Sequence, residues 1–186
     1  SLKRFRRNSM DCQISMVKLE PNRVYGEAMA ENAVRLEAGN PAPNFTLLDQ
    51  DLQPVDSSRL FETPTIFFFF PAAGSPGCSK EAADFQDNLS DFAEKGYKIV
   101  GVSPDGPERL KEFWLSHDLE FPLLSDPDVA VHKAFGAHGE KSLYGRIYKG
   151  VLRSTIIIGE GGVVEQAMYN VKATGHTNML KRKLGF

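Results

Sequence analysis

The stretch TIFFFFPAAGSPGCSKEA, residues 65–82, joins an apolar run to a loop that carries a single cysteine. The run from Thr65 to Phe70 has aromatic and β-branched residues without polar alternation, which is typical of a strand covered on both faces. Pro71 ends the strand because it has no N–H for the sheet ladder. The small residues after it leave room for another molecule. The sequence therefore predicts a central strand that opens into a bay.

A helix is predicted to begin within this loop. Ser75 is suited to the N-cap and Pro76 to the first helical position, which places Cys78 in the first turn, at capping-box spacing from Ser75. Unpaired N–H groups and the helix dipole favour an anion there. A free thiol has a pKa of about 8.5, and helix N-termini lower such values to roughly 3.5–7.5. We expect an acidified, nucleophilic Cys78, the alternative being a small buried core residue.

The remainder of the chain alternates strands with helices. Apolar runs predict a second buried strand, helical spacing of apolar residues predicts several helices, and a glycine-rich turn predicts a hairpin. The predicted elements are a helix over 78–96 that ends at Gly96, a strand over 97–103, helices over 107–118, 126–137 and 176–185, and a hairpin over 153–170. The fold class is α/β, with a central mixed β-sheet flanked by helices.

Two regions of the chain differ in their sequence patterns. Residues 37–186 have turn residues that bracket short apolar segments, and we interpret them as one domain. Residues 1–36 show no sustained periodicity, and we interpret them as an N-terminal extension, part of it a remnant of cloning. A basic arm that binds an anionic partner is the alternative interpretation of the extension.

Composition excludes several classes of function. The chain has 186 residues, 41% of them apolar and 25% charged, and a net charge of −2, so nothing draws it to nucleic acid or membranes. Its apolar runs are too short to cross a bilayer. With two cysteines and four histidines at no metal-binding spacing, we expect neither a disulfide framework nor a metal or other cofactor. A small-molecule partner and a cytoplasmic location are the predictions.

The motif SPGCSKEAADFQD, with Pro71, Ser75 and Cys78 at fixed spacing, resembles the peroxiredoxins, and among them the bacterioferritin comigratory protein or PrxQ group. That group's pattern is TPGCTxEA followed by spaced Phe and Asp. The similarity covers residues 37–186. It continues through GNPAPNFTLLDQDLQPV, YKIVGVSPD, FPLLSDP, RSTIII and VKATGH, in the family's order.

The resemblance implies a thioredoxin-like fold and a thiol peroxidase that forms a sulfenic acid from hydrogen peroxide or an organic hydroperoxide. Cys78 would be the peroxidatic cysteine, Ser75 the hydroxyl that hydrogen-bonds thiolate and peroxide, and Pro71 the shield of the sulfur. Arg153, directly before STIIIGE, matches the family's active-site arginine, and Arg146 is the fallback candidate. Without the resemblance, Arg153 would be interpreted as a solvated residue at a strand start.

One departure from the family concerns regeneration of the thiol. Many members carry a resolving cysteine five residues after the first, and here Ala83 stands at that position. Either an external thiol reduces Cys78, as in a one-Cys enzyme, or Cys12 resolves it. Thioredoxin, a glutaredoxin-like protein and a low-molecular-weight thiol are the candidate reductants, and the resemblance favours a monomer or weak dimer. A peroxide sensor with little turnover and a plain binding module are the alternative functions.

Overall fold

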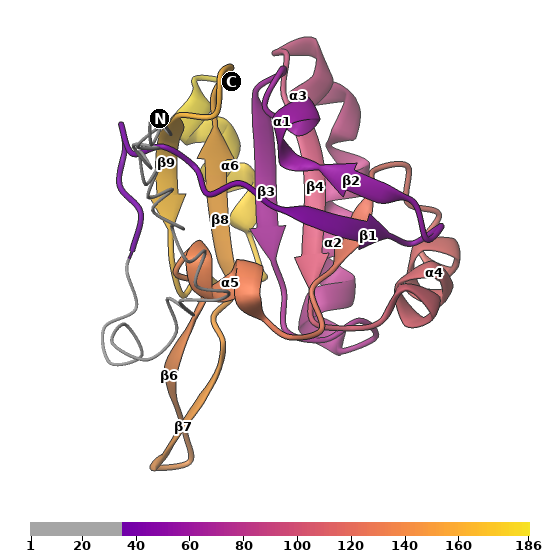
Figure 1. Ribbon diagram of the computed structural model, residues 1–186, viewed down its shortest axis with the longest axis vertical. Coiled ribbons are helices and arrows are strands. Elements are labelled where there is room, and N and C mark those ends of the chain that lie inside the picture. The colour runs from indigo at the N-terminus through magenta and orange to yellow at the C-terminus, as the bar shows by residue number, and fades with distance from the viewer. Residues whose placement is uncertain (1–34) are drawn as a thin grey trace, which may run out of the picture. The chain divides into compact units, whose positions relative to one another are not determined.

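The computed structural model describes residues 35–186, so Cys12 and most of the predicted extension lie outside the described residues. In this part of the chain, seven strands form one mixed sheet and two more form a separate ribbon (Figure 1). The large sheet contains β1 (Thr46–Asp49), β2 (Pro54–Asp56), β3 (Thr65–Phe69), β4 (Lys98–Ser103), β5 (Leu123–Ser125), β8 (Ser154–Ile158) and β9 (Val164–Met168). The ribbon contains β6 (His138–Leu143) and β7 (Arg146–Val151).

The strands of the large sheet follow the order β2-β1-β5-β4-β3-β8-β9. Strand β3 lies inside it, parallel to β4 and antiparallel to β8. The helices are α1 (Ser57–Leu60), α2 (Pro76–Asp87), α3 (Leu89–Glu94), α4 (Pro107–Ser116), α5 (Ala130–Ala134) and α6 (His176–Leu184). The predicted α/β class with a mixed sheet is confirmed. None of the helices in residues 35–186 has the length and apolar character needed to cross a membrane.

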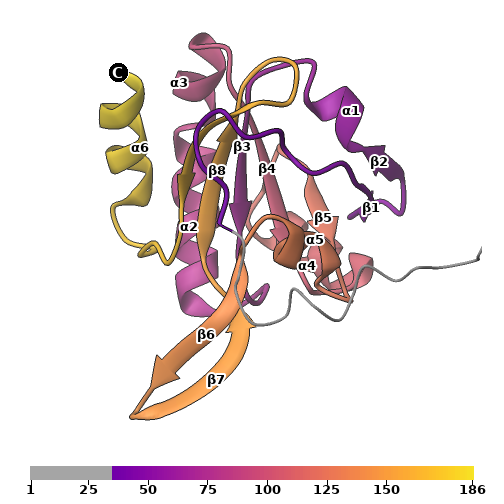
Figure 2. The same ribbon diagram turned by 60° about the vertical axis from the view of Figure 1, so that its left-hand side comes forward.

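Strand β3 is buried on both faces, as its lack of polar alternation predicts. Because successive side chains of a strand point to opposite faces, Phe68 and Phe70 belong to one apolar cluster and Phe67 and Phe69 to another. Helices α2, α3, α4 and α6 cover the first face, and α1 and α5 cover the second (Figures 1 and 2). Phe68 stacks on Phe85 of α2, with ring centroids 4.6 Å apart. This stack fixes α2, and with it the loop before α2, against β3.

Two predicted elements need correction. The predicted helix over 78–96 is broken at Asn88, whose side chain donates to the Asp84 carbonyl at 2.7 Å and leaves α2 and α3 as separate helices. The predicted helix over 126–137 shortens to α5, whose N-cap is Val129, and the Asp126 side chain accepts from the backbone N–H groups of Val131 and His132 at its start. Local side-chain hydrogen bonds to the backbone thus lie at both boundaries.

The β6–β7 ribbon is an element that the sequence patterns did not predict. Its residues are largely exposed, and its apolar side chains gather near the turn instead of following the alternation that marks a half-buried strand. The predicted hairpin over 153–170 is confirmed as β8–β9, with Gly161 and Gly162 at positive φ in its turn.

Gly101 of β4 is required by close packing. It pairs with Phe68 of β3 on one side and with Leu123 of β5 on the other. A Cβ atom at position 101 would lie 2.7 Å from Leu123 Cδ2 and 2.9 Å from Phe68 Cζ. These distances are too short for carbon atoms in contact, so any larger residue at position 101 would displace the side chains of Phe68 and Leu123.

We predict that Gly101→Ala lowers the free energy of unfolding by about 1–3 kcal/mol, because the added methyl group overpacks the core. Denaturant unfolding measures the change. Gly150→Ala is the matched control, since a Cβ there meets Lys141 Cδ at an ordinary 3.5 Å. Equal stability of the two variants would contradict this account of β4.

Candidate active site

Cys78 lies in the first turn of α2, as the sequence predicts. Ser75 is the residue before the helix, with φ −70° and ψ 148°, and Pro76 is the first helical residue. The loop from Pro71 to Ser75 leads into this helix from the end of β3, so Cys78 sits at the carboxyl edge of two parallel strands, β3 and β4. Cys78 is only 1% exposed. Burial alone also suits a core cysteine, so its polar contacts decide between the two interpretations.

The loop before α2 is held at one peptide position, Ala73. Its N–H donates to Asp105 Oδ2 at 2.6 Å, and its carbonyl accepts from Arg109 Nη2 at 3.1 Å. Asp105 also accepts from the Ser103 hydroxyl at 2.6 Å. These partners follow β4, the parallel neighbour of β3, and strand ends at the same sheet edge come together. The loop therefore has a fixed shape before any substrate binds.

Ser75 occupies the predicted N-cap position, but the capping-box hydrogen bond is absent. The Ser75 hydroxyl instead donates to the Ala72 carbonyl at 3.0 Å, and the Ser75 N–H donates to the same oxygen at 3.3 Å. Because the Ser75 hydroxyl bonds to Ala72 in this tight turn, it makes no hydrogen bond to the N–H groups of the first helical turn. Because a hydroxyl also has acceptor lone pairs, Ser75 can still accept a hydrogen bond from a molecule in the loop.

Arg153 makes the decisive contact with the cysteine. It lies between β7 and β8, and its carbonyl accepts from the Val171 N–H at 2.9 Å. Arg153 Nη2 lies 3.3 Å from Cys78 Sγ. A Cβ atom on Gly77 would lie 3.3 Å from Nη2, so a side chain at position 77 would press against the guanidinium. The alternative candidate, Arg146, is exposed on β7.

Glu81 is a site residue that the sequence reasoning missed, having taken it for a favourable acid in the first turn of the helix. It is fully buried, and its Oε2 accepts a hydrogen bond from Arg153 Nη1. Among residues 35–186, Glu81 Oε1 has no hydrogen-bond partner. Burial raises the pKa of Glu81 to about 7, and the charge of Arg153 opposes this rise. The sequence did offer one signal for Glu81. It stands three residues after Cys78, and residues three apart on a helix lie on the same face.

A neutral histidine adjoins this group. His176 Nε2 lies 2.6 Å from the Thr155 hydroxyl of β8. Burial, together with the charges of Arg153 and Lys183, lowers the pKa of His176 to about 4. His176 is therefore uncharged near neutral pH, and the guanidinium of Arg153 supplies the positive charge beside the sulfur.

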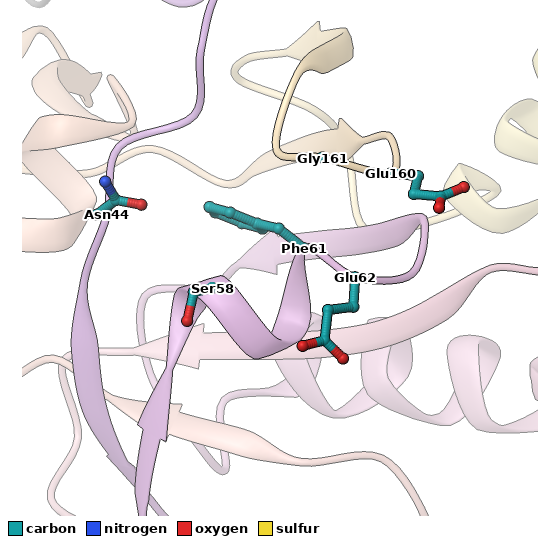
Figure 3. Close-up of a pocket in the computed structure, with 6 residues that line it drawn as sticks. All are labelled: Asn44, Ser58, Phe61, Glu62, Glu160 and Gly161. Carbon is teal, nitrogen blue, oxygen red and sulfur yellow. The ribbon is translucent and has the colours of Figure 1, made fainter.

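A cavity of about 460 Å³ lies elsewhere, lined by Asn44, Ser58, Phe61, Glu62, Glu160 and Gly161 (Figure 3). The β3–β8 register pairs Thr65, at the start of β3, with Ile158, at the end of β8. The cavity therefore lies near the opposite end of these strands from Cys78. Two carboxylates line the cavity, but none of its lining residues is a cysteine or a cation. No group of three potential metal ligands occurs among the residues that the structure describes.

The arrangement suits nucleophilic sulfur chemistry on a small electrophile. The sulfur is buried in the first helical turn, where backbone N–H groups lack intrahelical acceptors, and a guanidinium contacts it from the side. Such donors stabilise negative charge on sulfur and on an oxygen leaving group. The predicted residues Cys78, Ser75 and Arg153 come together here, and Pro71, half-buried, begins the loop.

Comparisons with known proteins agree with this chemistry. The sequence profile described as the AhpC/TSA family matches residues 38–167. Rv2521 of Mycobacterium tuberculosis, named a peroxiredoxin by inference, is 50% identical over 150 residues, which are 81% of this chain and 96% of that protein. Peroxiredoxin Bcp of Escherichia coli is 35% identical and covers 78% of this chain and 93% of its own.

A solved structure of a bacterial protein is also similar to this chain, in both fold and sequence. Xanthomonas campestris bacterioferritin comigratory protein, studied for its alkyl peroxide reduction activity, superimposes with a TM-score of 0.71. The two chains are 30% identical, and the match covers 83% of this chain and 98% of the Xanthomonas chain.

We predict that Glu81 makes stability depend on pH. Its folded-state pKa of about 7 lies above the ordinary value of 4.5, so its contribution is full below pH 4.5 and is lost as the pH rises through 7. The unfolding free energy of the unaltered chain, minus that of Glu81→Gln, should therefore fall between pH 5 and pH 8. Denaturant unfolding at both pH values measures this difference.

Glu94→Gln is the control for this prediction, because Glu94 is exposed on α3. Its unfolding free energy should follow that of the unaltered chain at both pH values. A pH-independent difference between the unaltered chain and Glu81→Gln would contradict the raised pKa.

Proposed function

The chain belongs to the AhpC/TSA family and, within it, to the peroxiredoxins of the Bcp and PrxQ group, which are thiol-dependent peroxidases, and we propose that it works as a one-Cys enzyme. In this proposal it reduces hydrogen peroxide and organic hydroperoxides through a sulfenic acid on Cys78. The observation that carries it is the contact of Arg153 Nη2 with Cys78 Sγ at 3.3 Å, on a guanidinium that Glu81 also binds.

The first half-reaction is a displacement at oxygen. The Cys78 thiolate attacks the terminal oxygen of the peroxide, so an S–O bond forms as the O–O bond breaks. The sulfur is oxidised to Cys–SOH, and the departing oxygen leaves with the electron pair of the O–O bond and takes up a proton to become water or an alcohol. Negative charge thus moves from sulfur to the leaving oxygen during the reaction.

The side chains around the sulfur suit this movement of charge. The planar guanidinium of Arg153 has several donors and stays charged, so it can contact sulfur and peroxide together. The Ser75 hydroxyl donates to Ala72, so it would accept a hydrogen bond from the peroxide O–H. Pro71 would limit the access of water to the sulfur from the end of β3. Burial of Glu81 keeps the guanidinium fork oriented without bringing solvent to the site.

The second half-reaction needs a reductant. Among residues 35–186, Cys78 is the only cysteine, and the family's resolving position, Ala83, is on α2. Thiol from outside would attack the sulfenic acid, with thioredoxin, a glutaredoxin-like protein or a low-molecular-weight thiol as the source. Return of Cys78 to the thiol suits a reducing compartment such as the cytoplasm, and we propose that the chain acts there as a monomer or weak dimer.

Sensing of peroxide is a second candidate function. The lack of another cysteine in residues 35–186 favours it, because a sulfenic acid without a resolving thiol next to it can persist and be relayed to a partner. Steady turnover with a thiol reductant separates the enzyme from the sensor.

We predict that Cys78→Ser abolishes peroxide reduction, and that Arg153→Ala slows sulfur oxidation by about 100-fold or more because a charge-stabilising donor is lost. Arg153→Lys should give an intermediate rate. Stopped-flow mixing of reduced protein with peroxide measures the step in the absence of any reductant. Arg146→Ala is the matched control, and its oxidation rate should equal that of the unaltered chain. Near-normal oxidation of Arg153→Ala would overturn the proposed role of this arginine.

The one-Cys proposal predicts that Cys12→Ser keeps steady-state turnover within about twofold when an external thiol is supplied, because that thiol reduces the sulfenic acid of Cys78 directly. Peroxide consumption with dithiothreitol measures the turnover. Loss of most turnover in Cys12→Ser, with oxidation of Cys78 unchanged, would instead assign resolution to Cys12.

A further inference from the structure

The β6–β7 ribbon is separate from the large sheet and projects beside the end of it at which β8 begins (Figures 1 and 2). Arg153 directly precedes β8. Its two strands pair in continuous register from His138↔Val151 to Leu143↔Arg146. Tyr144 and Gly145 between them have φ values of 50° and 76°. Positive φ at both central residues is the type I′ turn, whose twist matches that of paired strands. The ribbon therefore has a defined tip.

The tip of the ribbon carries a concentration of exposed apolar side chains. We define the hairpin tip as Leu143, Tyr144, Ile147 and Tyr148, which are 53%, 96%, 72% and 44% exposed. Only four other large apolar side chains are exposed in residues 35–186, and they are spread over other elements. Apolar exposure gathered on one element marks an interaction surface more often than exposure of single residues does.

Strand β7 leads from the tip toward Arg153, the residue that contacts Cys78. Lys141 and Tyr148 are paired across the strands, and both side chains reach to within 3.5 Å of where a Cβ on Gly150 would be, so they lean toward the base of the ribbon. Only Leu152 separates β7 from Arg153. Partial burial and the charge of Arg153 lower the pKa of Lys141, and the Cys78 sulfur opposes this shift. Lys141 is therefore close enough to Arg153 for the two charges to interact.

The charge of the ribbon restricts what can bind it. Lys141, Arg146 and Lys149 are its cations, and Glu140 is its one carboxylate, whereas the chain as a whole has a net charge of −2. An apolar tip flanked by excess positive charge complements a partner with apolar residues inside an acidic rim. Repulsion between two equally positive ribbons makes tip-to-tip association of two copies unfavourable.

We propose that the hairpin tip is the docking surface for a protein dithiol reductant with an acidic rim, which it guides to the sulfenic acid of Cys78. This inference rests on the proposed function. A protein partner fits better than a small thiol because the tip residues extend along the ribbon away from the sulfur, where a small thiol bound at Cys78 would not reach them. Cys78 is 1% exposed, so the incoming thiol must be placed accurately at the edge of the site.

The reduction that this docking serves is balanced in two steps. A thiolate of the reductant attacks the sulfur of Cys78–SOH, forming an S–S bond, and hydroxide leaves and takes up a proton as water. The second thiolate of the reductant then attacks its own partner sulfur in that mixed disulfide. The Cys78 thiol leaves in its reduced form, and the reductant ends as an internal disulfide that has lost two electrons.

The test compares two pairs of substitutions in the full chain. Leu143→Ser with Ile147→Ser removes apolar surface from the tip, and Leu52→Ser with Leu115→Ser removes similarly exposed leucines elsewhere as the matched control. Each variant is assayed for peroxide consumption with a bacterial thioredoxin, its reductase and NADPH, and separately with dithiothreitol. Sedimentation velocity gives the oligomeric state of each variant.

We expect the tip variant to lose on the order of tenfold in kcat/KM for thioredoxin, as interface truncations do, and to match the unaltered chain with dithiothreitol. The control variant should match the unaltered chain with both reductants. Equal rates for the tip and control variants with thioredoxin would overturn the proposal, as would an equal loss with dithiothreitol or a change of oligomeric state in the tip variant alone.

Two further outcomes separate this inference from the function beneath it. If the unaltered chain turns over with dithiothreitol but not with thioredoxin, the docking proposal fails and the peroxidase stands. If the unaltered chain consumes no peroxide with either reductant, the proposed function itself fails.

Discussion

The contact between the Arg153 guanidinium and the Cys78 sulfur is the interaction on which the site depends. One nitrogen of the fork lies 3.3 Å from the sulfur, and another donates to the buried carboxylate of Glu81. A lysine could offer only a point charge here, whereas the planar fork serves both partners at once. Because Glu81 is on the same helix face as Cys78, helix α2 itself fixes the distance between the two groups that the arginine joins.

Strand register brings Arg153 to this position. Ser154, the next residue, pairs with Phe69 at the end of β3, directly before the loop that leads to Cys78. A slip of one residue between β3 and β8 would turn every side chain of β8 to the other face of the sheet. The aromatic residues of β3 prevent such a slip, since each face packs them against different helices. The apolar core thus determines the polar geometry of the site.

Local sequence patterns were sufficient for the strand, the loop and the helix start that hold Cys78, since each follows from a few neighbouring residues. Arg153 is 75 residues away, and only the family resemblance singled it out. The burial of Glu81 could not be predicted, because a carboxylate in an early helical turn is usually solvated, and its partner Arg153 comes from the distant segment between β7 and β8. The β6–β7 ribbon was missed because most of its residues are exposed, so its strands carry no regular apolar alternation.

Intact mass spectrometry of the reduced chain, mixed with one equivalent of hydrogen peroxide and a sulfenic-acid trap, tests the central claim most directly. Rapid formation of a trapped adduct on Cys78, without the loss of two hydrogens that a disulfide would cause, is the result that the geometry of Cys78 and Arg153 predicts. A Cys78 that is oxidised no faster than a free cysteine in the same solution would contradict it, and would make this residue a buried part of the core.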